Sequence, residues 1–163
     1  MAAQAAHWFD LPSFYSSCDS VLCDHGTVAI LGYPILRLLE ANPAPILFQE
    51  YYRSFDAFWE PGCNRGLLDA SFQTEGVKSG CFKAAWTHSV VTVEKEAGLE
   101  AFRGYLGTWS AYRAFLRSKS SAADSHEDPA DLFIDRLRPY LKTPGKVRFA
   151  WDFFLLAAKK LPK

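Results

Sequence analysis

The 163-residue sequence has no surplus of charge, because its 18 lysine and arginine residues are matched by 18 aspartate and glutamate residues. Proteins that bind nucleic acid through its phosphates carry clustered basic side chains in excess. The composition therefore predicts a protein without a nucleic-acid partner.

A membrane-spanning run and a secretory leader are also missing. The last apolar stretch is too short to cross a membrane and is interrupted by Asp152. The first residues carry no basic segment, and their apolar run meets Asp10 early. We expect a cytoplasmic protein with no membrane partner, whose four cysteines are buried, reduced thiols: Cys18, Cys23, Cys63 and Cys81.

The sequence supports neither a serine hydrolase site nor a metal site. The sequence has no G-x-S-x-G turn, which argues against a serine hydrolase. Cys18 and Cys23 are five residues apart, which places them on different faces of a helix, so no metal site is predicted. His88 and His126 have no evident partner in the sequence.

What the chain does have is apolar and aromatic side chains, 49% and 15% of its residues, enough for the core of one ordinary domain. Residues 11–23 carry an apolar stripe at helical spacing, with Asp10 as the N-cap and Gly26 closing the helix. Residues 27–33 form a continuous apolar run typical of a buried strand. A helix followed by a buried strand indicates an α/β fold.

The remaining elements follow from the same patterns. They are a helix at 45–58, an ambiguous stretch at 67–85, a strand at 86–94, helices at 99–106 and 108–116, a mobile polar loop at 118–129, a helix at 129–140 and a strand at 147–160. Thr108 and Asp128 are expected to cap the helices that follow them. The last strand is apolar on both faces, which places it in the middle of a sheet.

Four segments in order carry a resemblance to a known family: QAAHWFD (4–10), VLCDHGTVAILGY (21–33), EYYRSFDAFWEPG (50–62) and YLGTWSAYRAF (105–115). Together they resemble class I S-adenosylmethionine-dependent methyltransferases, and most closely the type 11, trans-aconitate methyltransferase-like proteins. The resemblance covers residues 4 to about 158.

The resemblance implies a single α/β domain over residues 1–163, with a doubly wound, Rossmann-like sheet and an antiparallel final strand inserted between two others. Residues 2–6 would end the family's fourth strand and 27–33 would form the fifth. The last two strands would be 86–94 and 147–158. A helical lid insert would occupy about 34–59 and 97–142.

One family feature is not found. No strand is followed by a G-x-G-x-G turn, which would bring the backbone close to the cofactor. We therefore expect the chain to correspond to the C-terminal half of the family domain, with an incomplete sheet. The alternative to an enzyme is a non-catalytic truncated isoform or a pseudoenzyme fragment that acts as an interaction protein.

The resemblance places the cofactor beside Ala6, His7 and Trp8, at the carboxyl end of the fourth strand, where ligands bind open α/β sheets. Trp8 would line the S-adenosylmethionine site, and His7 would hydrogen-bond the substrate or assist proton removal as a catalytic residue. The alternative is that both side chains pack the strand against its helix. Without the glycine-rich turn, we expect this chain to bind S-adenosylmethionine weakly or not at all.

The resemblance also suggests that aromatic residues cover the methyl acceptor. The acceptor-binding candidates are Tyr52, Trp59, Trp109, Ser110 and Tyr112. Aromatic walls with a few hydroxyl groups suit a small organic acid, and a carboxylate is already a nucleophile, so that proximity supplies most of the catalysis. Hydroxyl and amine groups remain alternative methyl acceptors. For Phe55 and Phe58 a core position is favoured, and for Arg53, Arg103 and Arg113 a solvated surface position is favoured over binding the acceptor carboxylate.

Overall fold

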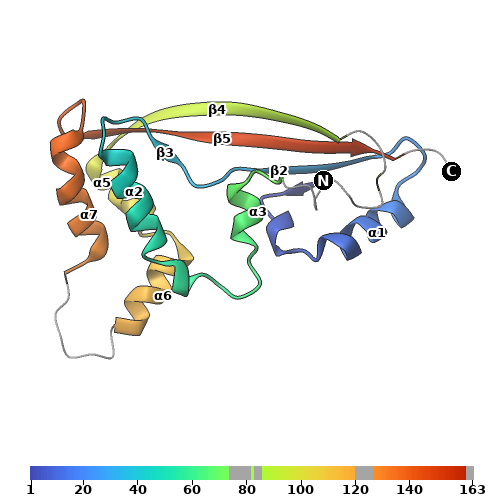
Figure 1. The fold of residues 1–163 in the computed structure, drawn as a ribbon, viewed down its shortest axis with the longest axis horizontal. Helices are drawn as coiled ribbons and strands as arrows, with labels where there is room; N and C mark the ends of the chain where they lie inside the picture. Colours follow the sequence, from blue (N-terminus) through green and yellow to red (C-terminus); the bar gives the residue numbers. More distant parts are fainter. Residues whose placement is uncertain (74–81, 83–85, 120–126, 161–163) are drawn as a thin grey trace. The chain divides into compact units, whose positions relative to one another are not determined.

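The computed structural model describes residues 1–73, 82, 86–119 and 127–160 and shows an α/β protein (Figure 1). Its residues divide into two compact units. Unit 1 comprises Met1–Ile35, Gly62–Val93 and Trp151–Lys163, and unit 2 comprises Leu36–Pro61 and Glu94–Ala150. Unit 2 contains most of the two segments expected to form the helical insert, and its role as a lid stays a prediction.

Five strands form one mixed sheet within the described residues. They are β1 (Ala2–Ala3), β2 (Thr27–Gly32), β3 (Arg37–Leu38), β4 (Trp86–Gly98) and β5 (Lys146–Lys159). Strands β1 and β2 are parallel, whereas β5 runs antiparallel to β2 and to β3. Strand β5 also pairs with β4, so the prediction of a final antiparallel strand between two others is confirmed.

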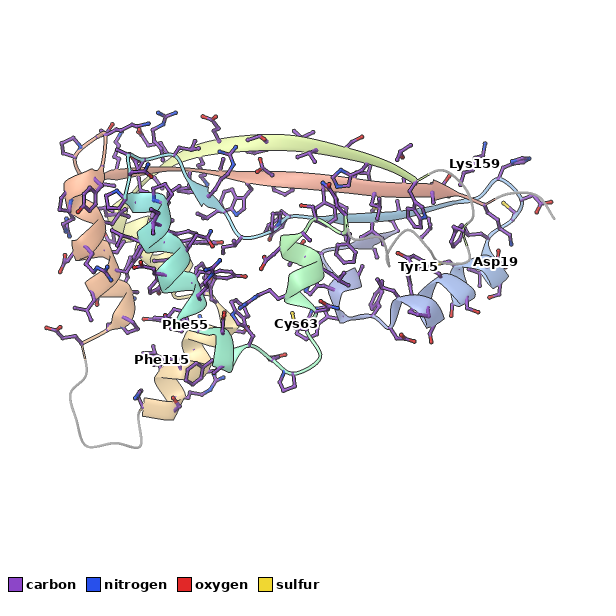
Figure 2. All side chains as sticks on the ribbon, viewed as in Figure 1. Tyr15, Asp19, Phe55, Cys63, Phe115 and Lys159 are labelled. Atoms are coloured by element: carbon purple, nitrogen blue, oxygen red, sulfur yellow. The ribbon has the colours of Figure 1, made fainter. Side chains whose placement is uncertain are left out.

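The register of β2 and β5 explains the apolar pattern of both strands. Thr27 pairs with Lys159 and Gly32 pairs with Phe154. Alternate residues of each strand are buried, including Ile30 and its partner Leu156. The core of unit 1 contains Ala2, Ala6, Tyr15, Val28, Ile30, Phe72, Phe82, Phe154, Leu156 and Ala158. Tyr15 is labelled in Figure 2.

Helix α1 (Leu11–Val21) carries the predicted apolar stripe, and its Tyr15 side chain packs against the rings of Phe82 and Trp86. Asp10 is the N-cap residue, but its carboxylate accepts a hydrogen bond from the Ser13 hydroxyl instead of from a backbone N–H.

The end of α1 differs from the prediction that Gly26 closes it. The helix ends at Val21, with Leu22 as the C-cap, and the residue in the left-handed conformation is His25, at a φ of 65°. Gly26 is needed for a different reason: a Cβ there would lie 2.9 Å from the Cys23 carbonyl oxygen. Lys160 completes the helix end by donating hydrogen bonds to two carbonyl oxygens, those of Asp19 and Leu22.

Two short elements were not predicted from the sequence. Helix α3 (Arg65–Asp69) begins at Asn64, whose side-chain oxygen accepts a hydrogen bond from the Leu67 N–H at 3.2 Å. Strand β3 consists of two residues paired with Phe149 and Ala150. The rest of the ambiguous stretch at 67–85 and most of the polar loop at 118–129 lie outside the described residues, as do Cys81 and His126.

Unit 2 contains the four predicted helices; the one at 99–106 has the predicted bounds, and the other three have shorter or shifted bounds. The four helices are α2 (Ala44–Arg53), α5 (Leu99–Leu106), α6 (Ser110–Lys119) and α7 (Pro129–Leu137). Single 3₁₀ turns at Asp56–Phe58 and Arg138–Tyr140 extend the first and the last of them. Helix α7 packs against both α2 and α5 (Figure 1).

The capping predictions had different outcomes. Asp128 caps α7, since its carboxylate accepts a hydrogen bond from the Ala130 N–H at 2.8 Å. The prediction for Thr108 was wrong, because its hydroxyl donates backwards to the carbonyl oxygen of Tyr105 at 2.7 Å and α6 begins only at Ser110. None of the helices in the described ranges is long and apolar enough to cross a membrane.

Candidate functional site

The first candidate site follows β1, where the chain turns away from the sheet. Gln4 has a φ of 48° and donates its backbone N–H to the Leu31 carbonyl oxygen at 2.7 Å. Its side-chain amide makes two hydrogen bonds with the backbone of Tyr33, accepting from N–H at 3.0 Å and donating to the carbonyl oxygen at 3.1 Å. The amide thus extends the pairing of β1 with β2 and fixes the start of the following 3₁₀ turn.

That turn, Ala6–Trp8, holds the three residues predicted to contact the cofactor. Ala6 is buried in the core of unit 1. The side chain of His7 is also buried, at 7% exposure, whereas that of Trp8 is 47% exposed. The two rings lie 5.4 Å apart, and the His7 carbonyl oxygen accepts the Asn64 N–H at 2.8 Å. One turn therefore presents an exposed indole beside a buried imidazole.

The imidazole of His7 has an unused polar atom. Its Nδ1 is buried and makes no hydrogen bond with any described residue. Burial lowers the pKa of His7 below its ordinary value of 6.5, so the ring is neutral at pH 7. Depending on the tautomer, the Nδ1 atom of a neutral ring can donate or accept one hydrogen bond. The lowered pKa makes the ring a weaker base than an exposed histidine.

The second candidate site is the aromatic cluster of unit 2. The rings of Tyr52, Trp59 and Trp109 contact one another, with centroids 5.6 to 6.5 Å apart. Tyr52 and Trp109 are buried, and Trp59 is half-buried. The three acceptor candidates, which come from separate parts of the sequence, are therefore brought together, and two of them also fill the core of the unit.

The other two acceptor candidates lie on α6. Tyr112 is buried and its ring packs edge-on against Phe55, at a centroid distance of 5.8 Å. Ser110 is exposed at the start of the helix. Phe55 is buried and faces Phe115 (Figure 2), as a core position requires, whereas Phe58 is only half-buried.

A charged network surrounds Tyr112. Its hydroxyl donates to the Asp128 carboxylate, with oxygen distances of 2.6 and 2.7 Å. Arg103 bonds the same carboxylate at 2.6 Å and Asp131 at 2.9 Å. Burial, with the Asp128 hydrogen bond and charge, raises the pKa of Tyr112 to about 12, and the hydrogen bond from Arg103 lowers the pKa of Asp131. Arg103 thus bonds two carboxylates, while 37% of its side chain stays exposed to solvent.

Several smaller predictions are corrected by the structure. His88 has partners, because its Nε2 lies 3.2 Å from the Ser71 carbonyl oxygen and its ring stacks on Phe154. Arg113 is exposed, as predicted, and also donates Nε–H to the Gly107 carbonyl oxygen at 3.0 Å. The expectation of four buried thiols was wrong: Cys23 is exposed, because it follows the end of α1, and Cys18 and Cys63 are only half-buried.

Glu40 is a buried polar residue that the sequence did not single out. Its carboxylate accepts the backbone N–H groups of Lys142 at 2.9 Å and Arg148 at 2.7 Å. It therefore ties the segment around β3 to the start of β5. Within the described ranges no group of three His, Cys, Asp or Glu side chains could hold a metal ion.

Comparisons with known proteins agree with this architecture. A protein of Dictyostelium discoideum named as a methyltransferase is 28% identical to the chain over 118 residues, 71% of this chain and 43% of that protein. A solved structure from Anaeromyxobacter dehalogenans, described as a type II methyltransferase, matches with a TM-score of 0.71 and 27% identity, over 99% of this chain and 64% of that one. No protein-family model matches the sequence.

The chain therefore has the Rossmann-like α/β fold of a methyltransferase. It also spans less than half the length of the Dictyostelium protein and 64% of the solved bacterial chain. The resemblance found in the sequence is confirmed at the level of methyltransferases.

Proposed function

We propose that this chain works as part of an S-adenosylmethionine-dependent methyltransferase of the type 11, trans-aconitate methyltransferase-like group, and that its acceptor is the carboxylate of a small organic acid. The observation that carries the proposal is the structural match to a methyltransferase over 99% of the chain. The antiparallel β5, paired with both β2 and β4, supports it further.

The turn after β1 fits such a cofactor chemically. The exposed face of Trp8 can stack on an adenine ring or face a cationic sulfur. The buried Nδ1 of His7, which no described residue satisfies, can make one hydrogen bond to a polar group brought beside it. The cofactor supplies, when bound, a methyl group on a positively charged sulfur. Trp8 and His7 would hold and orient it.

The acceptor chemistry needs little from the protein beyond placement. A carboxylate is ionised at pH 7 and attacks without prior loss of a proton, so a neutral His7 of lowered pKa is no obstacle. Among the five acceptor candidates, Tyr52, Trp109 and Tyr112 are buried. We therefore assign direct contact with the acceptor to Ser110 and Trp59. The three buried rings support the surface that these two residues form.

The methyltransferase relatives are longer than this chain, and we propose that it corresponds to the C-terminal part of their shared fold. Calorimetric titration of the 163-residue chain with S-adenosylmethionine is then expected to give an affinity weaker than micromolar, less favourable than about −8 kcal/mol. Micromolar binding would contradict this assignment.

Transfer of a radiolabelled methyl group tests the proposal, because it detects slow turnover even when binding is weak. The chain is incubated with methyl-labelled S-adenosylmethionine and a panel of small organic acids, and methyl esters are counted as label released by alkali. We expect release above the protein-free control, lost in Trp8→Ala and kept in Phe9→Ala, which removes the neighbouring exposed ring.

The outcomes distinguish an enzyme from a non-catalytic protein. An absence of transfer together with measurable binding of S-adenosylmethionine would contradict the enzyme and favour the alternative, a non-catalytic protein. Label that withstands alkali would instead contradict the carboxylate acceptor and indicate a hydroxyl or amine.

A further inference from the structure

One face of unit 2 exposes apolar side chains. Within the described residues of this unit, the large hydrophobic side chains that stay exposed are Ile46 on α2, at 55%, and Leu132 on α7, at 45%. Helices α2 and α7 pack side by side (Figure 1). Ile46 lies one turn before Glu50, on the same side of α2.

The same face has a hollow. A pocket of about 230 Å³ lies between the two helices, with Glu50 and Ser54 on one side and Leu132 and Arg136 on the other. Tyr51 and Phe133 also line it, and their rings stack with centroids 4.6 Å apart at 19°. Leu132 is therefore both a wall of this apolar hollow and an exposed apolar side chain.

The charged residues that line the hollow are one acid, Glu50, and one base, Arg136. The Glu50 carboxylate and the Arg136 guanidinium lie 3.5 Å apart, with side chains 59% and 62% exposed. Because both are largely solvated, each can also pair with an opposite charge on an approaching surface. A surface with one acid and one base beside an apolar centre is complementary to itself when rotated by half a turn.

We propose that this face, defined by Ile46, Glu50, Leu132 and Arg136, is a homotypic interface through which two copies of the chain associate about a two-fold axis. The exposed side of Leu132, at the wall of each hollow, packs against the hollow of the other copy. Glu50 of each copy faces Arg136 of the other. The two α2–α7 pairs then form a four-helix arrangement with a small apolar centre.

A second copy suits the face better than a foreign helix does. An exposed leucine at the wall of an apolar hollow, with an acid and a base beside it, gives the face apolar and charged parts that can match those of its own copy about a two-fold axis. A foreign partner would have to repeat the same pattern of leucine, acid and base. The chain also has no net charge, so two copies do not repel each other over long range.

Exchange of the two charges tests the proposal by sedimentation velocity at loading concentrations from about 1 to 300 µM, which bracket micromolar affinity. Glu50→Arg alone and Arg136→Glu alone each place like charges across the interface, so each is expected to stay monomeric. An equimolar mixture of the two variants restores both cross-copy pairs, and so does the double variant. Both are expected to dimerise like the unaltered chain.

Leu132→Asp is expected to weaken the dimer at least tenfold, and Val21→Asp, an exposed apolar residue on α1, serves as the matched control. Thermal melting of each variant shows that loss of the dimer is not loss of the fold. An unaltered chain that stays monomeric, a dimer insensitive to Leu132→Asp, or single variants that the mixture does not rescue would overturn the proposal. Binding of a foreign helix without self-association would overturn it as well.

Discussion

Removing the Asp128 carboxylate is expected to destabilise unit 2, because groups from three helices bond to it. This one group accepts hydrogen bonds from three helices: the Tyr112 hydroxyl on α6, the Arg103 guanidinium on α5 and the Ala130 N–H at the start of α7. The three helices that it joins contribute the buried rings of Phe102, Tyr112 and Phe133 to the core of unit 2.

The magnitude for Asp128→Ala follows from these three contacts. Loss of the N-cap costs about 1 kcal/mol. The buried Tyr112 hydroxyl loses its acceptor, which costs about 1–2 kcal/mol. Arg103, with 37% of its side chain exposed, contributes no more than about 1 kcal/mol after solvent screening. Since the contacts are coupled, we expect about 3 kcal/mol in total.

Asp128→Asn separates the contributions, because asparagine keeps both the cap and an acceptor for Tyr112 and should cost only about 1 kcal/mol. Urea unfolding with linear extrapolation measures these values, and thermal melting should show Asp128→Ala lowered by about 6–12 °C. Asp131→Ala is the matched control, since it removes only the more exposed partner of Arg103. A loss below about 1 kcal/mol for Asp128→Ala, or equal to that of the control, would refute the account of this network.

Four further outcomes are expected. Gly32→Ala should destabilise by about 1–3 kcal/mol, because its Cβ would lie 2.7 Å from a ring carbon, whereas Gly104→Ala, with open space around it, should stabilise α5 by up to about 1 kcal/mol in thermal melts. Glu40→Ala should cost about 2–4 kcal/mol in urea unfolding, because two backbone N–H groups lose their acceptor, and Glu40→Gln should cost less. The lowered pKa of His7 means that stability falls as the pH drops below 6.5, and His7→Asn should remove that part of the slope. Burial raises the pKa of Tyr15 to about 12, so stability should fall as the pH rises from about 10 to 12, and Tyr15→Phe should lack this decline. Equal slopes for variant and unaltered chain would contradict either pH prediction.

Elements with a long, regular pattern could be predicted from the sequence. The apolar stripe that begins at Leu11 predicted α1. The continuous apolar run from Val147 predicted β5 and its position in the interior of the sheet. Helix α3 and strand β3 could not be predicted, since five and two residues are too short to show a period. They are set instead by the Asn64 cap and by pairing with β5.

The site was predictable only in part, for a similar reason. Ala6, His7 and Trp8 are neighbours in the chain, so their shared turn follows from their order. The engagement of Arg103 by Asp128 and Asp131 depends on the packing of α5 against α7, which no local pattern encodes. The one signal available in the sequence was the spacing of Asp128 and Asp131, two acids three residues apart at the start of a helix.

Contact between Trp8 and the cofactor is the central functional claim, and nuclear magnetic resonance of the Trp8 indole N–H measures it most directly. Trp8→Ala assigns the signal, and S-adenosylmethionine is then added to the 163-residue chain up to millimolar concentration. If the cofactor contacts Trp8, the Trp8 signal shifts and saturates, and Phe9→Ala preserves this shift. A Trp8 signal that stays unmoved, or that moves equally with an unrelated nucleoside, would contradict the claim.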